Sequence, residues 1–324
     1  MKRLLPLLLA LAITTACAQT PPVAPPPPET PLSPSPESVP STPEPPPEEP
    51  PAPAVPDPLD ELPEDPLPPT SSQPAPEPPA SQETPPAERS FWEIREDMVE
   101  NAAAFQEENP DTVGWLYLYD TTIDSPVLQT VDNTYYLKHD DYKREDVNGA
   151  IVSDYRNRLT GRDSQSQNLV LYAHSKDEDP DGGVEASREF EHFTELKRYQ
   201  DKAFCEARPY FLFATTRESM VFEVFAVFHT KTSFVYNTPD PSRGQMEEIL
   251  AEAKKKSLFD FGVEVTADDR IMTLSTCCRR IVPTYPNGYR FVVMGRLVEK
   301  GRVLDYDRTV TDNPTALAPW NIYE

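Results

Sequence analysis

The sequence predicts one mainly β domain, a barrel or a sandwich, that follows a long proline-rich segment. Of the 40 prolines, 29 lie between residues 18 and 88, where no glycine, lysine or arginine occurs. All three tryptophans, all 14 tyrosines and all 14 phenylalanines lie after residue 88. Beyond residue 110 the apolar runs are short and rich in Val, Phe and Tyr, which is typical of strands.

Residues 1–17 are typical of a secretory signal peptide. A positively charged start precedes the apolar run Leu4 to Ile13, which is too short to span a bilayer, and small residues follow it. Cys17 at that point resembles a bacterial lipobox, although Thr14 stands where this pattern prefers leucine. We therefore expect a signal of lipoprotein type with lipidation of Cys17. Simple cleavage and an uncleaved anchor are the alternatives, and all three place the domain outside the cytoplasm.

Residues 18–88 carry 13 acidic residues and hardly any large apolar side chain, so burial cannot offset the chain entropy lost on folding. The segment is interpreted as a disordered or polyproline-like acidic stalk. We expect a folded domain over 89–305 and a C-terminal extension over 306–324. The net charge of −24 argues against nucleic-acid binding, because phosphate contacts need clustered Lys and Arg.

The folded part begins with a predicted helix over Phe91–Glu108, whose apolar residues recur at spacings of three and four, and Asn109-Pro110 ends it. Two further helical segments are predicted over Glu189–Tyr199 and Gln245–Lys256. Polar turn clusters separate eight predicted strands, which begin at Gly114, Ser125, Gly149, Asn168, Tyr210, Met220, Arg270 and Tyr289.

Three residues at the ends of predicted strands carry candidate chemistry. His174 ends the run NLVLYAH, where a titratable ring suits proton transfer near neutral pH. Cys277 ends the run IMTLSTC, and Arg290 opens the next strand after a short loop. A guanidinium beside the thiol could stabilise an oxyanion. Taken singly, each has a plainer interpretation: a structural histidine, a buried cysteine and a solvated arginine.

The cysteines favour a reactive thiol over a disulfide framework. If Cys17 carries lipid, Cys205, Cys277 and Cys278 remain, an odd number that leaves at least one thiol free. Cys278 is a second possible nucleophile, but neighbouring side chains on a strand point to opposite faces, so only one of the two can face His174. Arg279 and Arg280, which follow Cys278, compete with Arg290 for the electrostatic role.

The chain resembles the sortase family in the order of its motifs, which are NLVLYAH, then TLSTC about 100 residues later, and then RFVVMGRLV. Segments such as 109–142, the run GAIVSDYRN from Gly149 and the run FTELKRYQDKAF from Phe193 are similar to class B. The resemblance spans about residues 91–300. It implies an eight-stranded barrel with an N-terminal helix, and a long helix before the penultimate core strand, here Gln245–Lys256.

The resemblance also implies the chemistry. A sortase of Gram-positive bacteria cleaves the C-terminal sorting peptide of a surface protein after threonine, forms a thioester and transfers the product to an amine of peptidoglycan or of a pilin subunit. By motif match, Cys277 attacks, His174 moves the protons and Arg290 holds the oxyanion or the peptide carbonyls. The matching substrate-groove positions are Asn133, Leu137, Tyr172 and Ser275, for which packing is the plainer role. No cofactor or metal is implied, and the N-terminal anchor implies a place at the outer face of the membrane or in the cell wall.

The sequence departs from the family pattern at YAHS, where YGHN is common, and in the acidic loop with Asp177, Glu178, Asp179 and Asp181. That run lacks the spacing of an EF-hand, which favours a solvated loop over a calcium site. Two other functions remain open. An L,D-transpeptidase-like wall enzyme lacks its expected His- and Gly-rich signature before the cysteine, and a catalytically idle surface binding module on a stalk agrees with the altered YAHS.

Overall fold

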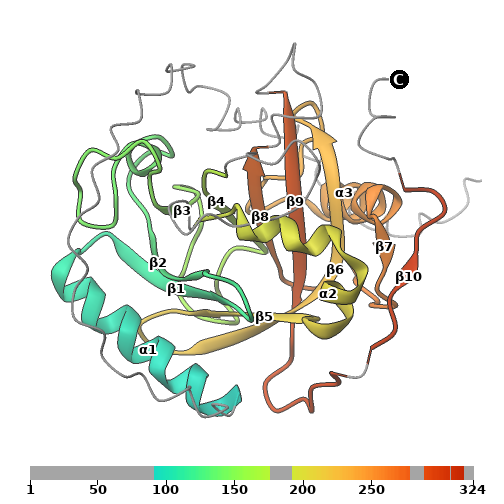
Figure 1. The fold of residues 1–324 in the computed structure, drawn as a ribbon, viewed down its shortest axis with the longest axis horizontal. Coiled ribbons are helices and arrows are strands. Elements are labelled where there is room, and N and C mark those ends of the chain that lie inside the picture. Colours follow the sequence, from blue (N-terminus) through green and yellow to red (C-terminus); the bar gives the residue numbers. More distant parts are fainter. Residues whose placement is uncertain (1–90, 176–191, 278–287, 307, 317–324) are drawn as a thin grey trace, which may run out of the picture. The chain divides into compact units, whose positions relative to one another are not determined.

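The computed structural model describes residues 91–175, 192–277, 288–306 and 308–316. All eight predicted strands are present and form one closed barrel (Figure 1). The family-based expectation of a barrel is therefore confirmed over the alternative of a sandwich. The barrel strands are β1 (Thr112–Leu118), β2 (Asp124–Leu128), β3 (Ile151–Ser153), β4 (Asn168–Tyr172), β5 (Tyr210–Ala214), β6 (Ser219–Lys231), β8 (Ile271–Cys277) and β9 (Tyr289–Leu297).

The strands follow the order β1-β2-β3-β4-β8-β9-β6-β5, and β5 pairs with β1 to close the barrel. Two neighbouring pairs are parallel, β2 with β3 and β4 with β8, and the other pairs are antiparallel. Parallel neighbours need a long crossover, and the chain between β4 and β8 supplies β5, β6 and α3 (Arg243–Lys256). The β4–β8 pair thus joins residues that lie far apart in the sequence.

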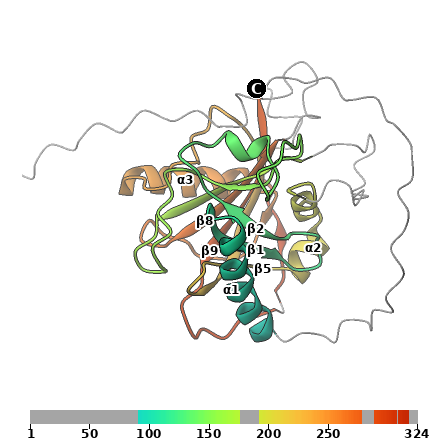
Figure 2. The ribbon, with the colours of Figure 1, turned by 90° about the vertical axis from the view of Figure 1, so that its left-hand side faces the viewer.

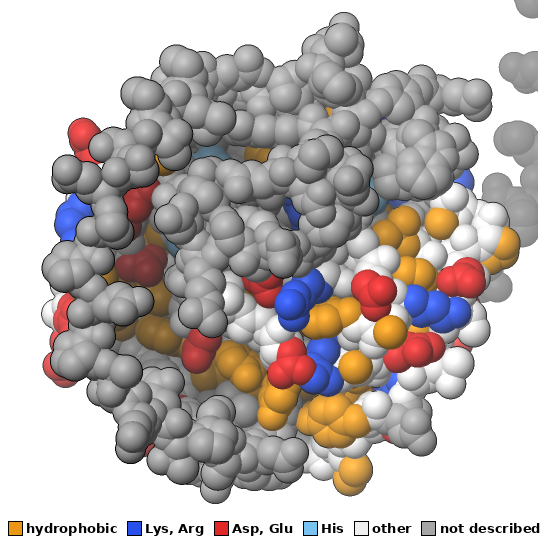
Figure 3. All heavy atoms as spheres, in the orientation of Figure 1, with side chains coloured by type: hydrophobic (Ala, Val, Ile, Leu, Met, Phe, Trp, Pro, Cys, Tyr) orange, Lys and Arg blue, Asp and Glu red, His pale blue; other side chains and the backbone are white. Residues whose placement is uncertain are grey.

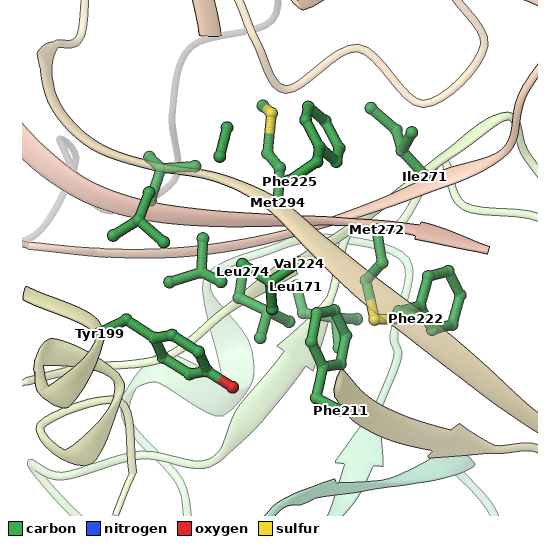
Figure 4. Packing of buried hydrophobic residues seen from close by; sticks show 14 of the residues in the cluster. Leu171, Tyr199, Phe211, Phe222, Val224, Phe225, Ile271, Met272, Leu274 and Met294 are labelled. Atoms are coloured by element: carbon green, nitrogen blue, oxygen red, sulfur yellow. The ribbon is translucent and has the colours of Figure 1, made fainter. Parts of the chain in front are cut away.

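The inside of the barrel is filled by aliphatic, aromatic and methionine side chains (Figure 4). The rings of Phe211 and Phe222 stack with their centroids 5.4 Å apart, and both lie close to Gly295 of β9. A Cβ atom on Gly295 would meet the Phe211 ring at 2.5 Å, so only glycine leaves room for this ring at that position.

The helix α1 (Phe91–Glu108) has the predicted bounds and crosses the outer face of β1 and β5 (Figure 2), where Met98 and Ala102 are buried. The helix α3 packs on β6 and begins at Arg243, two residues before the prediction, because Ser242 and Gln245 form a capping box there. It precedes β8, as the resemblance implies.

The predicted helical segment over Glu189–Tyr199 is helical over the later part of its described residues. The structure has a 3-10 helix, η3 (Glu195–Gln200), followed by a short α-helix, α2 (Lys202–Ala207), that the sequence analysis missed. A further 3-10 helix, η2 (Tyr135–Leu137), and a small sheet of β7 (Phe259–Asp260) with β10 (Thr311–Asp312) were also not predicted. Among the described residues no helix has the length and apolarity needed to cross a membrane.

Candidate active site

Strands β4 and β8 bring His174 and Cys277 to the same end of the barrel. Their parallel register pairs Tyr172 with Ser275, and His174 and Cys277 each follow two residues later. Two hydrogen bonds continue the contact past the last paired residues: Thr276 Oγ1 donates to the Ala173 carbonyl at 2.7 Å, and Ser175 Oγ donates to the Cys277 carbonyl at 2.9 Å. Side chains two apart on a strand share a face, so His174 lies on the face of Cys277.

Arg290 lies directly opposite Cys277 in the antiparallel β8–β9 register. Its side chain is fully buried, and its Nη1 donates to the Tyr289 carbonyl at 2.9 Å. Neighbouring strands are about 4.8 Å apart, so three adjacent strands present a histidine, a thiol and a guanidinium at one end of the barrel. The structure therefore brings together the three residues that the sequence analysis named as catalytic.

The thiol of Cys277 belongs to an apolar cluster outside the main core. Leu137 and Tyr172 share this cluster, and Cys277 is 2% exposed. A buried, weakly hydrated position strengthens the interaction of the sulfur with a nearby cation, because the local dielectric constant is low. Cys205, the other described cysteine that forms no disulfide, is also buried, and its Sγ lies 3.2 Å from the Tyr199 carbonyl oxygen. Burial raises the pKa of the Cys205 thiol.

The ring of His174 is oriented by the backbone of η2. Its Nε2 lies 2.8 Å from the Leu137 carbonyl oxygen. A carbonyl oxygen only accepts hydrogen bonds, so Nε2 carries the proton of this contact. In the neutral ring the lone pair is then on Nδ1, which makes Nδ1 the nitrogen suited to exchange a proton with the reacting groups.

The four predicted substrate-groove residues are all buried. The Asn133 side chain donates to Asp154 Oδ2 at 3.2 Å and accepts from the Tyr155 amide at 2.8 Å. The Tyr172 hydroxyl donates to Asp154 Oδ2 at 3.1 Å. Ser275 shares a 2.8 Å hydrogen bond with the hydroxyl of Tyr236, and Leu137 contacts His174 through its carbonyl oxygen.

Asp154, which the sequence does not single out, joins Asn133 and Tyr172. Its carboxylate is fully buried and accepts hydrogen bonds from Arg156, from Nε at 2.8 Å and from Nη2 at 2.7 Å. Asn237 then donates to the Tyr172 hydroxyl at 3.1 Å, while its carbonyl oxygen accepts from Arg156. The available signal was an acidic and a basic residue, two apart, directly after the short strand β3.

Two other histidines have structural surroundings. His229 on β6 is 3% exposed, lies 3.2 Å from Gln200 Oε1 and packs against Phe291. Burial lowers the pKa of His229 to about 3, and the nearby charge of Lys197 acts in the same direction. His139 stacks on Tyr135 with ring centroids 4.0 Å apart. Neither arrangement places a base beside Cys277.

Several predicted features lie outside the described residues: Cys17, Cys278, Arg279, Arg280 and the acidic loop 177–181. Within the described ranges no group of three or more His, Cys, Asp or Glu side chains is arranged to hold a metal ion. On the face shown in Figure 3, several basic side chains lie next to acidic ones, with hydrophobic side chains between them.

Known proteins resemble this chain in both sequence and structure. Sortase B of Listeria monocytogenes is 37% identical over 210 residues, which are 64% of this chain and 76% of the relative. Sortase B of Staphylococcus aureus is 32% identical over 170 residues, which are 52% of this chain and 64% of the relative. No protein family model matches the sequence.

Two solved structures share the fold and, at more than a quarter of the aligned positions, the residues. A Staphylococcus aureus sortase B–substrate complex has a TM-score of 0.53 and 28% identity, over 63% of this chain and 87% of that one. Sortase B of Clostridium perfringens has a TM-score of 0.51 and 28% identity, over 60% of this chain and 98% of that one. With its closed eight-stranded barrel, this chain belongs to the class B sortases and is a cysteine transpeptidase.

Proposed function

We propose that this sortase cleaves the C-terminal sorting peptide of surface proteins after a threonine and transfers the threonine to an amine of peptidoglycan or of a pilin subunit. The observation that carries the proposal is the shared end of β4, β8 and β9, where the parallel β4–β8 register and the Cys277–Arg290 pair gather a base, a nucleophile and a cation. Nucleophilic acyl transfer needs these three kinds of group together.

In the first step the Cys277 thiolate attacks the carbonyl carbon of the threonine and forms the C–S bond of a tetrahedral intermediate. The Arg290 guanidinium stabilises its oxyanion. His174 gives a proton to the leaving amine nitrogen as the C–N bond breaks, which leaves a thioester on Cys277 and releases the C-terminal fragment.

In the second step the acceptor amine attacks the thioester carbon. His174 takes the proton that the amine loses, the C–S bond breaks and Cys277 returns as a thiolate. One amide bond is exchanged for another, so the step needs neither an oxidant nor a bound cofactor. The orienting contact from Leu137 to Nε2 supports this role, because it holds the ring while Nδ1 exchanges the proton.

Relatives support both the substrate and the acceptor. One solved structure of Staphylococcus aureus sortase B is a complex with a substrate. Another sortase B structure, with 29% identity and a TM-score of 0.52, is a complex with triglycine, which has a free amine. We propose that Asn133, Leu137, Tyr172 and Ser275 support the wall of the peptide groove, since their buried hydrogen bonds fix the surface next to Cys277.

We also propose that the domain over 89–305 works outside the cytoplasm at the end of a tether. The signal over 1–17, lipidation at Cys17 and the stalk over 18–88 support this location. An extended polyproline stalk of this length would reach on the order of 200 Å. The catalytic domain would then work in the cell wall, at a distance from the membrane.

The test is a cleavage and transfer assay on the chain from residue 18, with a library of threonine-containing sorting peptides and triglycine as the acceptor amine. Mass spectrometry identifies the thioester and the transfer product. We expect both with the wild type, and neither with Cys277→Ala. Cleavage that persists in Cys277→Ala would contradict the assignment of the nucleophile, and a wild type that cleaves no peptide favours an idle binding module.

Cys205→Ala is the matched control, because this buried thiol lies on α2 and belongs to the main core cluster, whereas Cys277 belongs to another cluster. It should retain activity and lose only stability. Cys278→Ala distinguishes the two adjacent thiols: it should still form the thioester.

A further inference from the structure

A pocket of about 280 Å³ lies on the outside of the barrel, where β1 ends and β5 begins. Four tyrosines, Tyr117, Tyr119, Tyr210 and Tyr306, line it together with Phe211 and Arg208. Its volume is near the lower end of the range of ligand pockets, about 300 Å³. The proposed catalytic residues do not contribute to it.

The tyrosines form two edge-to-face pairs. Tyr117 and Tyr119 have ring centroids 5.5 Å apart at an angle of 77°, and Tyr210 and Tyr306 have centroids 5.4 Å apart at 73°. Such pairs hold aromatic rings in fixed orientations. Fixed aromatic walls are the surface on which proline-rich segments bind, because a polyproline helix is extended before binding and loses little entropy.

Arginine side chains gather near the pocket, although the chain as a whole has a net charge of −24. Glu223, the strand partner of Tyr210, is buried among three guanidinium groups, those of Arg296, Arg302 and Arg308. The Arg308 guanidinium also lies 6.0 Å from the centre of the Tyr210 ring. Arg208, which pairs with Asp120, lines the pocket itself, so guanidinium groups border it.

Segment 56–69 of this chain, PDPLDELPEDPLPP, has the complementary chemistry. It holds six prolines, five acidic residues and three leucines, and no basic residue. Its prolines and leucines suit the tyrosine walls, and its carboxylates suit the arginines. The same chain thus supplies an aromatic pocket bordered by arginines and an acidic proline-rich segment.

The connection is long enough for the segment to reach the pocket of its own molecule. Residues 70–90 lie between the segment and α1, and 21 extended residues span at most about 65 Å. The helix α1 begins on the same outer face, since Met98 packs in one cluster with Tyr210 and Leu212. The chain therefore enters the domain on the side where the pocket lies.

We propose that segment 56–69 docks in this tyrosine pocket as a polyproline helix. The pocket is remote from the proposed catalytic residues: Glu223 pairs with Arg296, and Arg296 is six residues from Arg290 on β9, which is about 20 Å along the strand. Docking holds the stalk at the end of the barrel away from Cys277. It also leaves only the 38 residues 18–55 as free tether, with a reach of at most about 120 Å.

The test is limited proteolysis of the chain from residue 18 with a protease that cuts after glutamate. The segment offers the bonds Glu61–Leu62 and Glu64–Asp65, while Glu37–Ser38 and Glu83–Thr84 are internal controls in the same stalk. Each rate is divided by that of the same bond in a free synthetic peptide. We expect the two bonds of the segment to be cut at least tenfold more slowly than the controls.

Tyr306→Ala and Tyr119→Ala should remove this protection, and so should Pro63→Ala combined with Pro66→Ala, which keeps both cleavage sites. Tyr306 is 50% exposed, so its truncation leaves the fold intact, and Tyr155→Ala, 42% exposed on a loop after β3, is the matched control. Equal relative rates at all four bonds would overturn the proposal, as would protection that survives both pocket variants. Protection that rises with protein concentration assigns the pocket to a second copy instead. Repeating the assay in Cys277→Ala keeps the result independent of catalysis.

Discussion

Cys277 and Arg290 face each other across the antiparallel β8–β9 ladder, and both are almost completely withdrawn from solvent. Burying a guanidinium destabilises the fold, because taking a charge out of water costs several kcal/mol unless other groups compensate it. The proposed role of Arg290 beside the nucleophile explains why this charge is buried. Charge that develops on a substrate oxygen there meets a fixed cation in a medium of low dielectric constant.

Arg290→Met should lower kcat about 100- to 1,000-fold, since it removes the group that stabilises the oxyanion. Arg296→Met is the matched control: Arg296 lies on the same strand, but it pairs with Glu223 at the other end. We expect the control to lose stability with kcat nearly unchanged. The measurement is steady-state kinetics with kcat and KM resolved, and equal losses of kcat in both variants would count against the assignment.

The buried network around Asp154 should be measurable in stability. Asp154→Asn breaks the bidentate ion pair with Arg156 and weakens the contacts from Tyr172 and Asn133, so we expect a loss of about 3 kcal/mol in the free energy of unfolding. Tyr172→Phe should cost about 1 kcal/mol. Asp268→Asn, which breaks an exposed pair with Arg243, should leave the free energy of unfolding nearly unchanged. Urea denaturation compares the three variants, and similar losses in all of them would contradict the prediction.

The lowered pKa of His229 predicts that the fold loses stability in acid. Its pKa in the folded chain is about 3, below the ordinary value of 6.5, because burial disfavours the charged ring. The unfolded chain therefore binds the extra proton first, and stability falls as the pH drops from about 6.5 towards 3. The contribution to the slope is about 1.4 kcal/mol per pH unit. His229→Gln, which keeps a partner for Gln200, should reduce the slope by that amount, as measured by denaturation at several pH values. An unchanged slope would refute the prediction.

Replacing Gly295 and Gly244 with alanine should have opposite effects on the free energy of unfolding. Gly295→Ala places a Cβ atom 2.5 Å from the Phe211 ring and 2.9 Å from the Phe222 Cβ, so we expect a loss of about 1–3 kcal/mol from overpacking. Gly244→Ala lies in the first turn of α3 with nothing within 4 Å, and it should gain about 0.5–1 kcal/mol through helix propensity. Thermal denaturation measures the sign of the stability change in both variants. A stabilised Gly295→Ala would contradict the prediction and show that the two rings can move aside.

The hydrophobic runs of the sequence predict the barrel strands well, because strands such as β5, with five buried residues in succession, carry an unmistakable apolar pattern. The predicted helical segment over Glu189–Tyr199 forms a 3-10 helix in its described part for a visible reason. Phe193, Leu196 and Tyr199 recur at a spacing of three, which suits a 3-10 helix, whereas Met246, Ile249, Leu250 and Ala253 of α3 alternate spacings of three and one. The helix α2 is only six residues long, too short for a periodic signal.

The candidate site was predictable in its residue types and order, but its surroundings were not. Nothing in the sequence around Asp154 indicates burial, because its compensating contacts come from Asn133, Arg156 and Tyr172, which only the folded barrel brings together. The pocket of four tyrosines was missed for the same reason. Tyr117 and Tyr306 lie almost 190 residues apart in the chain and meet only through β1, β5 and the segment after β9.

The parallel pairing of β4 with β8 also determines at which stage of folding Cys277 can become reactive. About 100 residues separate the paired strands, so His174 and Cys277 become neighbours only after β5, β6 and α3 have been synthesised and the crossover has closed. A chain that is still being made, or is still unfolded, holds an ordinary cysteine with no base beside it. The topology thereby delays the chemistry until the folded domain is complete.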